Sequence, residues 1–80
     1  MIRLVFLGLL ADLAGAAEIV LDINEPTPLD ELIAMLEESL AAALRGAKVK
    51  LALNGALVAR AGLVAASGDE LAFLPPVSGG

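Results

Sequence analysis

The chain has no cysteine, histidine, tyrosine or tryptophan among its 80 residues, and its only aromatic residues are Phe6 and Phe73. The absence of cysteine excludes a disulfide framework, so we expect one domain around an aliphatic core. The absence of histidine, cysteine and tyrosine removes the usual acids, bases and nucleophiles of enzyme sites. This composition disfavours an independent enzyme.

The carboxylates and glycines that remain form no recognisable cofactor or metal site. Acidic residues occur as adjacent pairs, such as Asp30-Glu31 and Glu37-Glu38, and adjacent side chains diverge on a helix or strand. The histidine and cysteine spacings of metal sites are missing, and the glycines match no phosphate-binding fingerprint. We therefore expect no bound cofactor and no metal.

Basic residues are few, with five Lys and Arg against ten Asp and Glu and a formal net charge of −5. They form no cluster along the sequence, whereas nucleic acids and anionic membranes both require one. The longest apolar run, residues 4–11, is shorter than the ~20 residues that span a bilayer. We expect neither a nucleic-acid nor a membrane partner, and a cytoplasmic location.

A secretory signal peptide is the alternative interpretation of the first residues. Residues 4–11 would form its apolar region and residues 14–16 an A-x-A-like cleavage site. Against it, Arg3 is the only basic residue before the run, and Asp12 follows at once. Cleavage would also delete a segment that the fold needs.

Five segments have the apolar and β-branched composition or the alternation of strands, and they are residues 2–7, 18–23, 48–53, 57–59 and 70–74. Asn54-Gly55 predicts a type I′ hairpin turn. Residues 9–14, closed by Gly15, have the composition of a turn.

One main helix is predicted between the second and third strands. Thr27 is its expected N-cap, Pro28 occupies the first helical position and Gly46 ends it. Its apolar stripe has three- and four-residue spacing and consists of Leu29, Leu32, Ile33, Leu36, Leu40 and Leu44. The element order predicts an α+β fold, with the first and last strands paired at the centre of a mixed sheet and the helix on one face.

The first and last strands are apolar on both alternating rows. Because one helix covers only one face of a sheet, the second row is expected to form an exposed apolar patch, which is typical of an interaction site. A homodimer is one alternative, and coverage by the apolar loop near Leu63 and Val64 is the other.

The last six residues, Pro75 to Gly80, are the most informative segment. Pro75 and Pro76 cannot continue a sheet ladder and favour an extended path. Gly79 and Gly80 have no Cβ and fit a channel too narrow for other residues. We predict a domain of residues 1–74 and a flexible reactive tail of residues 75–80, which reaches about 20 Å when extended. A disordered terminus or the scar of a cleaved tag is the alternative.

The chain resembles the small subunit of molybdopterin synthase, one of the ubiquitin-like β-grasp sulfur carriers. The resemblance runs the full length and rests on residues 3–7, 12–15, 27–32, 53–54 and above all 68–80, which read GDELAFLPPVSGG. Thiazole-pathway sulfur carriers also end in Gly-Gly, but they are usually shorter and lack the Pro-Pro-Val element.

This resemblance implies a sulfur carrier whose active site belongs to a partner. A ubiquitin-activating-type adenylating enzyme would use ATP to convert the Gly80 carboxylate to an acyl-adenylate, and a persulfide donor would supply sulfur in place of AMP. The Gly80 thiocarboxylate would then enter the large synthase subunit and deliver sulfur to a pyranopterin precursor. Gly80 and Gly79 are the expected reacting residues, and the expected partner-binding residues are Phe6, Phe73, Pro75, Pro76, Val77 and Ser78.

Two other functions remain open. The chain is alternatively a related sulfur carrier or a protein modifier joined to lysine through Gly80, or a β-grasp scaffold without chemistry. Ala11 stands where relatives commonly carry a basic residue, and residues 61–66 form an unusually apolar loop. Both departures bear on partner affinity more than on the fold.

Overall fold

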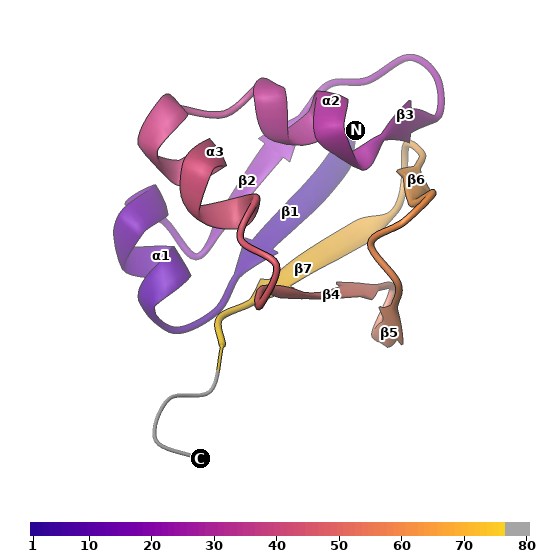
Figure 1. Ribbon diagram of the computed structural model, residues 1–80. Coiled ribbons are helices and arrows are strands. Elements are labelled where there is room, and N and C mark those ends of the chain that lie inside the picture. Colours follow the sequence, from indigo (N-terminus) through magenta and orange to yellow (C-terminus); the bar gives the residue numbers. More distant parts are fainter. Residues whose placement is uncertain (77–80) are drawn as a thin grey trace.

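A computed structural model describes residues 1–76, and residues 77–80 lie outside the described part. Figure 1 shows a twisted sheet with short helices over one face. The elements in chain order are β1 (Ile2–Phe6), α1 (Leu9–Ala14), β2 (Glu18–Leu21), β3 (Thr27–Pro28), α2 (Leu29–Ala34), α3 (Glu38–Leu44), β4 (Lys50–Leu53), β5 (Ala56–Val58), β6 (Val64–Ala65) and β7 (Glu70–Leu74). This arrangement is the predicted α+β fold with a mixed sheet.

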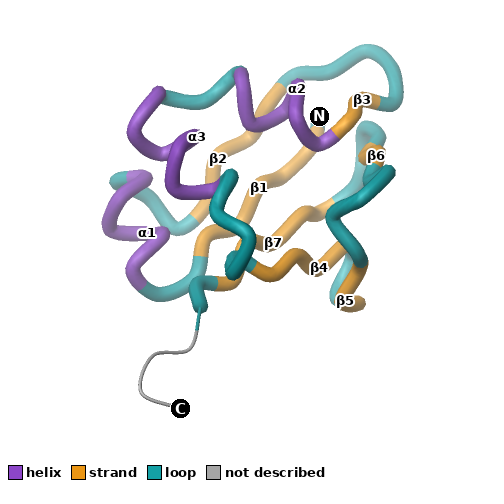
Figure 2. Tube along the Cα trace, in the orientation of Figure 1, coloured by secondary structure: helices purple, strands orange, loops and turns teal. Residues whose placement is uncertain are grey.

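The main sheet has the strand order β2-β1-β7-β4-β5. The first and last strands are neighbours and run parallel, with Leu4 opposite Leu71 and Phe6 opposite Phe73, while the other pairs are antiparallel. This confirms the predicted pairing of the chain's two ends, and Figure 2 shows β7 between β1 and β4. The Asn54-Gly55 turn is also confirmed, because both residues have positive φ, 51° and 87°, as type I′ requires.

One row of each central strand faces the helices and is buried. Leu4 and Leu71 are completely buried, and the rings of Phe6 and Phe73 stack with centroids 5.5 Å apart. The most deeply buried helical side chains in the same core are Leu32, Ile33, Leu40 and Leu44. The covered face of the sheet therefore holds the hydrophobic core.

The prediction of a single main helix that begins at Pro28 and is ended by Gly46 is wrong, because the structure divides this segment into α2 and α3. The last turn of α2 tightens, as the amide of Leu36 donates to the carbonyl of Ile33, and Leu36 is only half-buried. Glu37 then becomes the N-cap of α3, and its carboxylate accepts from the amides of Ser39 and Leu40. These bonds satisfy orphan donors at the new helix start, and α3 turns to pack against α1 and α2.

The turn predicted over residues 9–14 is also wrong, because this segment forms α1. Leu10 is buried in the core, and Gly15 ends the helix with a left-handed φ of 75°. Its amide donates to the carbonyls of Ala11 and Asp12, a common way to satisfy a helix C-terminus. Six residues are too few for a helical period to stand out in the sequence.

The prediction that Thr27 is the helix N-cap is also wrong. Thr27 pairs with Ala65 in the small β3–β6 ladder, and its hydroxyl donates to the carbonyl of Glu25 at 2.9 Å. Pro28 is the actual N-cap of α2. The loop before β6 contacts the same helix start, because the carbonyl of Leu63 accepts from the amide of Leu29 at 3.0 Å.

Candidate functional site

The candidate site begins where the chain leaves the central strand β7. The last β1–β7 contact there is a hydrogen bond from the amide of Leu7 to the carbonyl of Phe73, at 3.1 Å. Pro75 and Pro76 follow without an amide N–H, so they cannot extend the ladder. Pro75 is half-buried and Pro76 is exposed. The C-terminal segment therefore leaves from a fixed point at one end of the sheet (Figure 1).

Gly8 supports this exit point, and sequence reasoning did not identify it. Its φ of 55° belongs to the region that residues with a Cβ rarely adopt. A Cβ built on Gly8 would lie 3.1 Å from Cγ of Pro75, which is closer than an ordinary van der Waals contact. Glycine at the β1–α1 junction thus lets Pro75 pack directly against the backbone. The sequence signal that could have identified Gly8 is its position immediately after the predicted strand of residues 2–7.

The face of the sheet opposite the helices carries an apolar row from β1 to β5. Its members stand opposite one another in register, Val5 with Ala72, Ala72 with Ala52, and Ala52 with Leu57. The first three are half-buried, and Leu57 is 73% exposed. We call these four residues the outer row; Val5 and Ala72 belong to the second apolar row expected on the first and last strands, and Ala52 and Leu57 extend it across β4 and β5.

The outer row has different neighbours on its two sides, toward the exit point and away from it. On the side of the exit point lie Leu74, which is half-buried, Leu7, which is exposed, and Lys50, which stands opposite Leu74 and is also exposed. On the other side, Arg3 forms ion pairs with both Glu18 and Glu70. The hydrogen bond and charge of Glu70, followed by the charge of Glu18, raise the pKa of Arg3. The outer row is therefore continuous with the base of the tail through Leu74, and the ion pairs of Arg3 border it on the other side.

Two of the expected partner-binding residues are placed elsewhere by the structure. Phe6 is 2% exposed and Phe73 is 0% exposed, because their alternating row faces the helices rather than solvent. They belong to the hydrophobic core on the covered face of the sheet, opposite the outer row. Of the others, Pro75 and Pro76 lie at the exit point, while Val77, Ser78, Gly79 and Gly80 fall outside the described residues.

The acidic groups with shifted pKa values stabilise turns and a helix start. The hydroxyl and amide of Ser39 lower the pKa of Glu37 at the start of α3. The amide of Ala66 and then the side chain of Asn54 lower the pKa of Asp69. Within residues 1–76, no three acidic, histidine or cysteine side chains form a group suited to a metal ion. Nor does this part contain a helix long and apolar enough to span a membrane.

Three solved structures are similar to the chain over nearly its whole length. SAMP1 from Haloferax volcanii is 26% identical with a TM-score of 0.77, covering 99% of this chain and 98% of that one. Small archaeal modifier protein 1 of H. volcanii, in another crystal structure, is 25% identical with a TM-score of 0.75, covering 95% and 97%. The third is the complex of subunits 1 and 2 of the molybdopterin-converting factor from Helicobacter pylori 26695. The matching chain is 26% identical with a TM-score of 0.64, and the match covers 99% of this chain and 97% of that one.

A comparison with curated protein sequences gave no significant match. A comparison with protein-family models gave a match to the ThiS family over residues 4–80, which include nearly all of the chain and its Gly-Gly end. This agrees with the mixed sheet and the strand that runs into the exit point. The chain belongs to the ThiS family, whose members are ubiquitin-like sulfur carriers with the β-grasp fold.

Proposed function

We propose that the chain is the sulfur-carrying small subunit of a molybdopterin synthase. The observation that carries this proposal is the exit point, where the central strand β7 leads into Pro75, Pro76 and a chain that ends in Gly79-Gly80. Full-length similarity to a molybdopterin-converting factor complex supports the same function. The partner subunit would bind the tail and hold the active site.

Other proteins would convert the terminal carboxylate to its reactive form in three steps. A free carboxylate is a poor electrophile, so an adenylating enzyme first joins the Gly80 carboxylate to the α-phosphate of ATP and releases pyrophosphate. A persulfide sulfur then attacks the carbonyl carbon and displaces AMP, and a thiol reductant cleaves the remaining S–S bond. The product is a thiocarboxylate on Gly80.

The fold contributes position rather than acid–base catalysis. Six residues from Pro75 reach about 20 Å when extended at ~3.3 Å per residue, which is enough to carry the sulfur into a buried site. The folded body docks outside while the tail enters, so sulfur delivery becomes an intramolecular step within the complex. The outer row and the exit point provide a continuous surface for that docking.

The test is intact mass spectrometry after incubation with the adenylating enzyme of the same organism, ATP and a persulfide donor. We expect the mass gain of one sulfur replacing one oxygen on the C-terminal peptide.

Gly79→Ala should fold normally and react poorly, because the added methyl group hinders threading. Deleting Gly80 should be more severe, since it places the carboxylate about 3.5 Å short of the reacting centre and such a shift costs on the order of a hundredfold in rate. Full activity after this deletion would exclude the carrier mechanism, and a lower melting temperature would show a structural role for the tail.

A protein modifier is the second candidate, and the similarity to small archaeal modifier protein 1 favours it. In that function the activated Gly80 carbonyl would form an isopeptide bond with a lysine of a target protein. The same mass-spectrometry experiment, carried out in a lysate with ATP, separates the two functions. Lysine-linked conjugates that disappear when Gly80 is deleted would indicate a modifier, whereas a thiocarboxylate that transfers sulfur to the pyranopterin precursor in the large subunit would indicate the synthase.

A further inference from the structure

The charges of the chain are divided between two regions. Residues 39–68 contain four basic residues and no acidic one, and the remainder contains Arg3 and all ten acidic residues. Arg3 forms ion pairs with Glu18 and Glu70, whereas none of the four other basic side chains has a carboxylate partner within residues 1–76. The basic residues, scattered in sequence, are Arg45, Lys48, Lys50 and Arg60.

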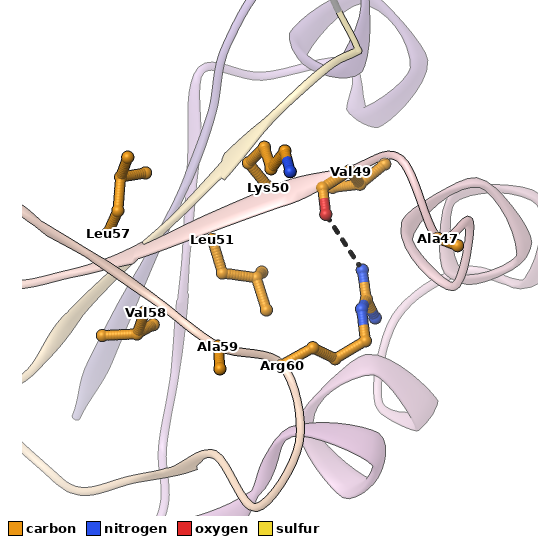
Figure 3. A pocket seen from close by; sticks show the side chains of 8 residues that line it. All are labelled: Ala47, Val49, Lys50, Leu51, Leu57, Val58, Ala59 and Arg60. Carbon is orange, nitrogen blue, oxygen red and sulfur yellow. Dashed lines mark hydrogen bonds between the residues drawn. The ribbon is translucent and has the colours of Figure 1, made fainter.

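The fold brings two of these residues, Lys50 and Arg60, to one pocket at the edge of the sheet. The pocket has a volume of about 480 Å³, within the range of ligand-binding cavities. Lys50 and Arg60 line it directly (Figure 3), while Arg45 and Lys48 lie on the α3–β4 connection on either side of a third lining residue, Ala47. Its apolar lining consists of Ala47, Val49, Leu51, Leu57, Val58 and Ala59. The result is an aliphatic hollow beside an unneutralised positive charge.

The early end of β5 creates this pocket. The β4–β5 ladder pairs Leu51 with Val58, and the chain then leaves the sheet at Ala59. Beyond the end of β5, the side chain of Arg60 donates hydrogen bonds to the backbone in place of a strand. Its Nη2 donates to the carbonyls of Val49, Leu44 and Gly46 at 3.4, 2.9 and 3.3 Å. These bonds hold the guanidinium at the pocket while its Nη1 and Nε donate to no acceptor within residues 1–76. A guanidinium has five N–H donors, so it retains donors for a ligand.

We propose that this pocket binds an acidic segment of a partner protein that presents a large apolar side chain between Asp or Glu residues. The apolar side chain enters the hollow beside Val49, Leu51 and Val58, and the carboxylates bind the charges of Lys50 and Arg60. Lys50 stands opposite Leu74 in the β4–β7 ladder, so the bound segment lies next to the exit point. The inference does not depend on the chemistry of Gly80 and holds for a carrier or a modifier.

The same observations favour a protein over a nucleic acid. The lining residues include no aromatic side chain on which a base could stack. Outside residues 39–68 the chain carries ten acidic residues against one basic residue, which repel a phosphate backbone that extends beyond the pocket. A short acidic segment needs only local complementarity, which also guides association of the partner.

The experiment is a titration of the ¹⁵N-labelled full chain, followed by amide chemical shifts. The probe is the capped peptide Glu-Asp-Leu-Phe-Asp-Glu, beside the reversed-charge peptide Lys-Arg-Leu-Phe-Arg-Lys and a thymidine hexanucleotide. We expect the acidic peptide to shift the amides of Val49, Lys50, Val58 and Arg60. Binding should weaken between about 0.01 M and about 0.15 M salt, because the Debye length falls from about 30 Å to about 8 Å.

Matched variants separate local recognition from net charge. Lys50→Gln and Ala34→Glu each lower the net charge by one, but only Lys50 lines the pocket. Lys50→Gln should weaken binding roughly two- to fivefold, as loss of an exposed ion pair does, and Ala34→Glu should change it less. Leu57→Ser should also weaken binding relative to Met35→Ser, since both side chains are exposed but only Leu57 lies in the pocket.

Several results would overturn the proposal. They are no shift with the acidic peptide at low salt, equal binding of the reversed-charge peptide, tighter binding of the hexanucleotide, or equal effects of Lys50→Gln and Ala34→Glu. Shifts at the pocket that grow with protein concentration alone would identify a second copy of the chain as the occupant, and they would overturn it too.

Discussion

The two faces of the sheet use the same strands for different purposes. On the covered face, Leu71 and Phe73 are completely buried. On the open face of the same strand, Ala72 and Leu74 remain half-exposed. Both rows are apolar, so hydrophobicity alone does not separate core from surface. The position of the helices does, because they cover only one of the two faces (Figure 1).

This difference indicates which apolar residues stabilise the fold and which are available for recognition. Burial of apolar area stabilises the folded state in proportion to the area removed from water. Residues of the outer row lose less area in the free protein than the covered row does, and they would lose more in the proposed complex. Substitutions on the two faces should therefore separate stability from partner binding.

The largest expected effect comes from the pair Leu71→Ala and Leu74→Ala, which removes the same atoms from opposite faces of one strand. Leu71→Ala should lower the free energy of unfolding by about 2 to 5 kcal/mol, because it leaves a cavity in the core. Leu74→Ala should lower it by about 1 kcal/mol. Urea denaturation of both variants measures the difference, and equal losses would show that the open face is as tightly packed as the core.

A smaller contrast is expected within the helical layer. Leu32 is completely buried, while Leu36 lies at the break between α2 and α3 and is only partly buried. Leu32→Ala should cost about 2 to 5 kcal/mol of unfolding free energy, and Leu36→Ala roughly half as much. The two values come from the same denaturation experiment. A greater loss at Leu36 would mean that the helix is continuous and that the break is wrong.

The sequence predicted the parts of the fold that depend on local patterns. The strands at residues 2–7 and 70–74, the Asn54-Gly55 turn and the central pairing of the chain ends are all confirmed. The helix break was not predictable, because Leu36 continues the apolar spacing and only the capping bonds of Glu37 interrupt it. A cap formed by a glutamate side chain has a weaker sequence signal than one formed by serine or aspartate.

The candidate site was predicted in part. Pro75 and Pro76 follow the last strand as expected. Phe6 and Phe73 were assigned to a partner surface because alternation cannot show which of two apolar rows faces a helix. The basic pocket was not visible either, since Lys50 and Arg60 are separated by the β4–β5 hairpin and come to line one pocket only in the folded sheet. Interpretation of such a site requires the register of the strands.

The smallest expected effect concerns the rim of the open face, where Asp69 holds the hairpin turn beside β7. Its carboxylate accepts from the amide of Ala66 at 2.8 Å and from the side chain of Asn54 at 3.0 Å, and these bonds lower its pKa. The folded-state pKa therefore lies below the unfolded value of about 3.9. The stabilising contribution is complete above about pH 5 and is lost as the pH falls through the folded-state pKa.

Asp69→Asn tests this contribution, because the variant lacks the titrating carboxylate. The difference in unfolding free energy between the wild-type chain and Asp69→Asn should be larger at about pH 6 than at about pH 2.5, since only the wild type loses the charged acceptor on acidification. Asp12→Asn is the matched control, because the carboxylate of Asp12 accepts no hydrogen bond within residues 1–76. The difference in unfolding free energy between wild type and Asp12→Asn should change less between the two pH values. Urea midpoints at several pH values provide the measurement. A difference for Asp69→Asn that grows toward low pH would reverse the sign and show that this carboxylate does not stabilise the rim of the open face.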